Sequence, residues 1–125
     1  MFESKQKTLK KIVNFAGTGL HLGKKVSINL KPAEADTGII FKRTDIKNNN
    51  EIKANYNNVS SAKLCTKLEN DHGVSVSTIE HLMAALYICG VDNLIVQIDG
   101  AEVPIMDGSS IEFVEKIKKT GLKTL

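Results

Sequence analysis

Residue types that define several specialised protein classes are scarce in this 125-residue chain, which has no tryptophan, two prolines and two cysteines. The cysteines, Cys65 and Cys89, form no CxxC motif and are too few for a disulfide scaffold, so we expect free thiols. The longest apolar run, residues 82–91, contains a glycine and falls well short of the ~18 residues that a membrane helix needs. The amino-terminal stretch is rich in lysine and has no apolar signal core, which favours a cytoplasmic location.

Arginine and aromatic residues are also rare. Of the 17 basic residues only Arg43 is an arginine, aromatic residues make up 5%, and the net charge is a mild +3. Proteins that bind nucleic acids commonly rely on arginine forks and stacking aromatics, so we expect no nucleic-acid partner. A content of 42% hydrophobic and 25% charged residues is instead typical of one soluble globular domain.

Hydrophobic patterning predicts strands in the first half of the chain and alternating helix and strand in the second. Strands are expected at residues 8–15, 26–30, 38–42, near Ile52, 64–68 and 94–98. The first three should form an antiparallel run with short connections. The last is almost wholly apolar, which indicates a central, buried strand.

Two helices are indicated by Ser/Thr-x-x-Glu capping boxes, one starting at Ser77 and the other at Ser109. Apolar residues then recur at helical spacing, and Gly90 and Gly121 are plausible helix ends. The predicted fold class is α+β, with a mixed, mostly antiparallel sheet and two helices packed on one face.

The pair Glu80–His81 is the sharpest chemical feature. A carboxylate beside an imidazole could be a general base next to a metal ligand. On spacing alone, however, Glu80 is fully explained as the acid of the capping box and His81 as a polar helix residue. A lone Glu-His pair is much weaker evidence than the HExxH motif, which supplies two ligands on one helix face.

Three further residues are candidates with simpler alternatives. His21 lies in a glycine-rich turn, where it could touch a substrate or merely be tolerated. Cys65 could be reactive but is more simply a small strand residue. Asp107 could serve a site or only shape the turn before the second helix. The three histidines and two cysteines show no close ligand pair, so no complete zinc site is evident.

Taken together, several segments resemble the UDP-3-O-acyl-N-acetylglucosamine deacetylase family, zinc hydrolases of lipid A biosynthesis. The matching segments, in order, are residues 8–13, 17–26, 36–45, 64–66, 77–86 and 104–109. The resemblance implies a ribosomal protein S5 domain 2-like fold and hydrolysis of acetate from an acylated UDP-N-acetylglucosamine. It also implies that Glu80 is the general base, that His81 is a zinc ligand and that Cys65 lies beside the active site. His21 and Asp107 fall in matching segments without an implied role.

The resemblance covers only the first of the two similar domains of that family. It implies that a second domain supplies the other zinc ligands and a wall of the acyl tunnel. We therefore expect residues 1–125 to be an amino-terminal domain, inactive in isolation. A non-catalytic interaction module that kept the fold is the alternative. The uncovered helix face could also form a homodimer.

Overall fold

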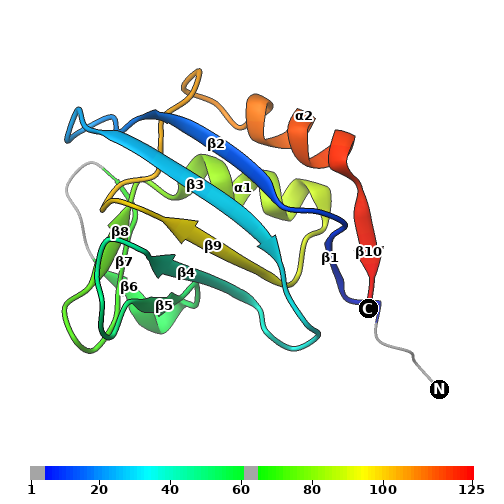
Figure 1. Cartoon of the computed structure of the whole chain (residues 1–125), viewed down its shortest axis with the longest axis horizontal. Coiled ribbons are helices and arrows are strands. Elements are labelled where there is room, and N and C mark those ends of the chain that lie inside the picture. Colours follow the sequence, from blue (N-terminus) through cyan, green and yellow to red (C-terminus); the bar gives the residue numbers. More distant parts are fainter. Residues whose placement is uncertain (1–4, 61–64) are drawn as a thin grey trace.

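A five-stranded sheet in the order β2–β3–β9–β4–β5 forms the centre of the molecule (Figure 1). The computed structural model describes residues 5–60 and 65–125. The strands are β2 (Val13–Thr18), β3 (Lys25–Pro32), β4 (Ile39–Arg43), β5 (Glu51–Lys53) and β9 (Leu94–Ile98). Neighbouring strands are antiparallel except β4 and β9, which are parallel. The predicted mixed, mostly antiparallel sheet is confirmed.

The strand β9 is central and buried, as its apolar sequence predicts. Leu94, Val96 and Ile98 have no exposed surface. β9 pairs with β3 on one side and β4 on the other. The prediction that the first three strands form one antiparallel run is therefore wrong. The most apolar strand takes the middle position, where both of its edges are paired, and it separates β3 from β4.

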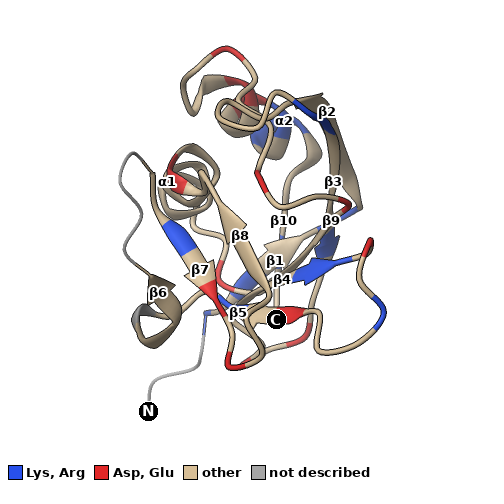
Figure 2. Ribbon diagram, turned by 90° about the vertical axis from the view of Figure 1, so that its left-hand side faces the viewer, with Lys and Arg blue, Asp and Glu red and all other residues tan. Residues whose placement is uncertain are grey.

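Both helices, α1 (Glu80–Cys89) and α2 (Ile111–Thr120), lie on one face of the central sheet (Figure 2). Each buries an apolar stripe against it, including Leu82 and Leu86 of α1 and Phe113 of α2. The Phe113 ring packs edge-on against Phe15 of β2, with ring centroids 4.8 Å apart. The α+β class and the placement of both helices are confirmed. No helix of the described residues is long and apolar enough to cross a membrane.

The helices begin differently from the prediction, because neither capping box forms. α1 begins at Glu80, since Ser77 belongs to a strand and its hydroxyl donates to the carbonyl of Ala101. Ser110 precedes α2, but its hydroxyl donates to the carbonyl of His81, in α1. At α1 a contact from another segment takes the hydroxyl of the predicted box, whereas at α2 the hydroxyl of Ser109 stays in its own loop, where it donates to Asp107 and accepts the Ile111 N–H. The predicted helix ends at Gly90 and Gly121 are confirmed.

The remaining strands are short. They are β1 (Lys7–Leu9), β6 (Val59–Ser60), β7 (Lys67–Glu69), β8 (Ser75–Ser77) and β10 (Leu122–Thr124), with a 3₁₀ turn at Tyr56–Asn58. β6, β7 and β8 form a small antiparallel sheet, and β1 pairs with β10. The strand predicted at 8–15 is thus two strands, β1 and β2, separated by a bend at residues 10–12. The strand predicted at 64–68 is β7, while Leu64 lies outside the described residues.

Candidate functional site

Three segments that are distant in the sequence meet at the start of α1. β8 runs parallel to residues 101–103, with hydrogen bonds from Ser77 N–H to the Ala101 carbonyl (2.9 Å) and from Val103 N–H to the Ser77 carbonyl (3.0 Å). The glycine-rich loop, residues 17–23 around His21, also contacts this segment, because Gly19 pairs with Pro104. These contacts place the turn around His21 beside the residues that lead into Glu80.

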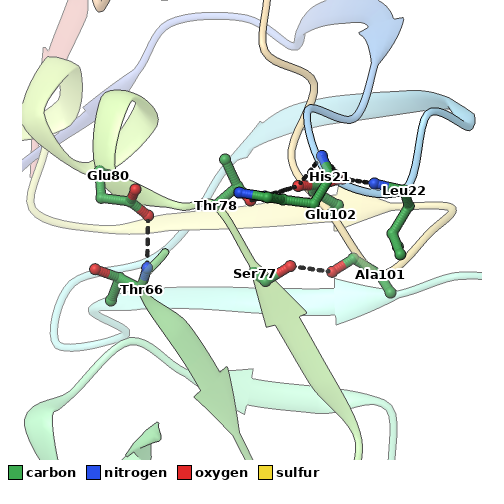
Figure 3. Close-up of polar contacts among 8 residues, drawn as sticks. All are labelled: His21, Leu22, Thr66, Ser77, Thr78, Glu80, Ala101 and Glu102. Carbon is green, nitrogen blue, oxygen red and sulfur yellow. Dashed lines mark hydrogen bonds and ion pairs between the residues drawn. The ribbon is translucent and has the colours of Figure 1, made fainter. Parts of the chain in front are cut away.

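The Glu80 side chain is held by the backbone of a neighbouring segment. Its Oε1 accepts a hydrogen bond from the Thr66 N–H at 3.0 Å (Figure 3). The Thr66 carbonyl in turn accepts the N–H of Thr78 at 2.9 Å. Glu80 is exposed and forms no capping contact, so the capping-box explanation of this residue is wrong. Its negative charge lies in the first turn of α1, where the helix dipole favours an anion.

Cys65 directly precedes Thr66, so its backbone lies next to the residue that holds Glu80. It is half-buried, and its thiol is free. This position agrees with a place at the margin of a site around Glu80.

His81 follows Glu80 in the first turn of α1 and is half-buried. Its carbonyl accepts the Ser110 hydroxyl at 2.9 Å, which joins the starts of the two helices. Within residues 5–60 and 65–125, no group of three or more His, Cys, Asp or Glu side chains gathers as a metal site would require. A catalytic zinc needs about three protein ligands, so His81 can supply one of them but the described residues do not complete the set.

Asp107 shapes the loop that leads into α2. Its Oδ1 accepts hydrogen bonds from the N–H (3.0 Å) and the hydroxyl (2.9 Å) of Ser109, and the Ser109 hydroxyl oxygen accepts the Ile111 N–H. The carboxylate is exposed and has no contact with Glu80 or His81 in the described structure. These contacts agree with the turn-shaping alternative, and a role of Asp107 in a site stays a prediction.

The residue that the sequence reasoning missed is Glu102, whose side chain is only 2% exposed. It is the acceptor for the glycine-rich loop: Oε1 accepts the Leu22 N–H at 2.9 Å, and the His21 N–H points at both carboxylate oxygens. Oε2 also lies 2.8 Å from His21 Nδ1 and accepts the Thr78 hydroxyl at 2.6 Å (Figure 3). A single buried carboxylate thus joins His21 to the segment that carries Glu80.

These contacts keep Glu102 ionised. Burial by itself would raise the pKa of this carboxyl group. The Thr78 hydroxyl, the backbone N–H groups of Leu22 and His21 and the His21 ring outweigh that effect and lower the pKa of Glu102 from 4.5 to about 2.

The backbone around Glu102 is adapted to this arrangement at two positions. Thr78 has φ of +60°, which is unusual for a β-branched residue, and it directs its hydroxyl to Glu102. Gly19 passes so close that a Cβ atom there would overlap Oε1 of Glu102. One sequence signal could have identified Glu102: it is the single charged residue in the otherwise apolar segment 101–105.

The chain is similar over almost its whole length to proteins of one family. A family model described as LpxC, UDP-3-O-acyl N-acetylglycosamine deacetylase, matches residues 6–125. UDP-3-O-acyl-N-acetylglucosamine deacetylases of Vibrio cholerae serotype O1 and Colwellia psychrerythraea are 49% and 50% identical to the chain over 121 residues. Each match covers 97% of this chain and 40% of the relative. The chain therefore spans about two-fifths of the length of these relatives.

Proposed function

Because the chain belongs to the UDP-3-O-acyl N-acetylglycosamine deacetylase family, we propose that it forms the amino-terminal domain of a zinc-dependent amide hydrolase. The whole enzyme would remove acetate from UDP-3-O-acyl-N-acetylglucosamine in lipid A biosynthesis, in the cytoplasm. The observation that carries the proposal is the exposure and orientation of the Glu80 carboxylate. Its carboxylate is exposed and oriented by the Thr66 N–H, and no helix cap occupies it.

Glu80 is assigned as the general base. Oε1 holds the hydrogen bond from Thr66, and Oε2 has no donor among the described residues. The carboxylate can therefore be fixed in direction and still accept the proton of the attacking water. A general base of this kind contributes about 10²–10⁴-fold to a rate.

His81 is assigned as one zinc ligand, supplied by the same helical turn. Zinc, when bound, would polarise the acetyl carbonyl as a Lewis acid. The remaining ligands would come from the part of the protein that corresponds to the rest of the relatives. Cys65 is placed at the margin of the site because it precedes Thr66.

The helical layer is the surface on which the rest of the protein would pack. It leaves Tyr87 and Ile88 of α1 and Ile111 of α2 exposed, and exposed apolar groups of this size favour a contact surface. A homodimer through the same face stays a prediction for the chain in isolation, since a second copy could cover these side chains.

The direct test joins residues 1–125 to the remaining part of the Vibrio cholerae relative. The joined protein should deacetylate UDP-3-O-acyl-N-acetylglucosamine, and the 125-residue chain alone should not. His81→Ala should lower both the zinc content and the rate. His72→Ala, which changes an exposed histidine in the β7–β8 turn, is the matched control and should alter neither. A folded, zinc-containing fusion without activity would instead support the non-catalytic interaction module.

A further inference from the structure

The contacts of Glu102 determine which nitrogen of the His21 ring carries a proton. An ionised carboxylate can only accept hydrogen bonds. The Thr78 hydroxyl has one proton, and it donates that proton to Oε2 of Glu102 at 2.6 Å. His21 Nδ1 lies 2.8 Å from the same oxygen and 3.3 Å from the Thr78 hydroxyl oxygen. Nδ1 is therefore the donor, and the ring has its proton on that side.

We propose that Glu102 is a positioning residue that fixes the His21 imidazole with its proton on Nδ1, so that Nε2 is the nitrogen that meets the substrate. The inference rests on the proposed deacetylase function of the neighbouring Glu80. In a neutral ring held in this form, Nε2 has a lone pair and accepts a hydrogen bond from a hydroxyl or amide N–H of the sugar nucleotide.

The side chains of His21 and Glu102 differ in how far they are exposed to solvent. The His21 side chain is 32% exposed, whereas the Glu102 side chain is 2% exposed. A ligand can thus reach the imidazole but not the carboxylate that holds it. Nε2 has no hydrogen-bond partner among residues 5–60 and 65–125, so this nitrogen is available to a ligand.

His21 and Glu80 are held by one continuous set of contacts, with Thr78 between them (Figure 3). The Thr78 hydroxyl binds Glu102, and its N–H binds the carbonyl of Thr66. The Thr66 N–H in turn binds Glu80. The carboxylate that orients His21 therefore also fixes the backbone beside the proposed general base.

The tautomer can be measured directly by ¹H–¹⁵N NMR of the imidazole in the 125-residue chain. Spectra are recorded at increasing pH until the ring signals no longer change, so that the neutral ring is observed. A His21→Gln variant assigns the His21 signals. We expect a protonated Nδ1 and an unprotonated Nε2 in the unaltered chain. A proton on Nε2 would overturn the proposal, and this reading needs no variant of Glu102.

Two variants sharpen the result. Glu102→Gln should shift the ring toward the form with the proton on Nε2, which an unconstrained neutral histidine favours. Thr78→Val, which removes a hydroxyl but keeps the carboxylate, should retain the proton on Nδ1. An unchanged His21 spectrum in folded Glu102→Gln would contradict the assignment.

Activity gives an independent readout in the joined protein. Glu102→Gln should lower kcat/KM by about 10- to 100-fold, the range for losing one hydrogen bond to a charged group. If Glu102 acts through His21, the same change should cause little further loss in a His21→Ala background. A further 10- to 100-fold fall in kcat/KM in the His21→Ala background would overturn the proposal. An inactive joined protein with the Nδ1 proton in place would overturn the deacetylase function while leaving the role of Glu102 in orienting His21 intact.

Discussion

Two glutamates on neighbouring segments have opposite surroundings. Glu102 is buried and accepts hydrogen bonds from Thr78, Leu22 and His21, including two backbone N–H groups. Glu80 is exposed and accepts one backbone N–H, from Thr66. A carboxylate whose oxygens are fully used and shielded from water does not exchange protons near neutral pH. A carboxylate that is held at one oxygen and has no donor at the other among the described residues is open to a ligand.

We infer different roles for the two residues. The free energy of the Glu102 contacts goes into holding the glycine-rich loop and the start of α1 in place. We expect Glu80 to contribute little to the fold, and we propose that it takes part in the chemistry.

The largest expected effect on stability comes from Glu102→Gln. A pKa of about 2 instead of 4.5 corresponds to about 3 kcal/mol of stabilisation of the native state at pH 7. Urea unfolding of the variant should show a loss of that order. Glu34→Gln, at an exposed position, is the matched control and should change the free energy of unfolding by less than about 0.5 kcal/mol. Equal effects at the two positions would contradict the account.

The stabilisation that Glu102 provides should depend on pH. The pKa of Glu102 is lowered in the folded state, so its stabilisation is complete above about pH 4.5 and is lost as the pH falls toward 2. The difference in unfolding free energy between the unaltered chain and Glu102→Gln should therefore shrink across this interval. A difference that stays constant from pH 7 to pH 2.5 would show that the ionised carboxylate is not its source.

A smaller loss is expected for Gly19→Ala. The added methyl group would overlap Oε1 of Glu102, and overpacking of this kind typically costs 1–3 kcal/mol. In a Glu102→Ala background the collision is absent, so the same substitution should cost much less. Urea unfolding of the four proteins in this cycle measures the coupling, and purely additive effects would rule out a direct contact.

The smallest effect is expected for Glu80→Gln. The amide oxygen of Gln can still accept the Thr66 N–H, and the position is exposed. The free energy of unfolding should change by less than about 1 kcal/mol, the usual net value of one hydrogen bond. A loss as large as that at Glu102 would remove the contrast between the two residues.

Local patterns in the sequence predict much of the fold. The strand at Leu94–Ile98 and the helix ends at Gly90 and Gly121 depend on residues near them in the chain, and the structure confirms them. The order of strands is different, because it depends on which distant segments pair. No local pattern shows that β9 separates β3 from β4, or that Ser77 bonds Ala101 and starts no helix.

The residues of the candidate site also differ in how far the local sequence identifies them. Glu80 and His81 stand out because they are adjacent and belong to a segment that resembles a known family. Glu102 has no partner nearby in the sequence: His21 is 81 residues away and Thr78 is 24. Its role depends on three segments meeting in space, and only the single charge within an apolar segment hints at it.

The most direct test of the central claim is the deacetylation rate of the joined protein with Glu80→Gln. We expect kcat to fall by about 10²–10⁴-fold, with the zinc content and the free energy of unfolding nearly unchanged. Such a result would place Glu80 in the chemistry and leave Glu102 as the residue that holds the site. A folded, zinc-loaded Glu80→Gln protein that deacetylates at the parent rate would contradict the account.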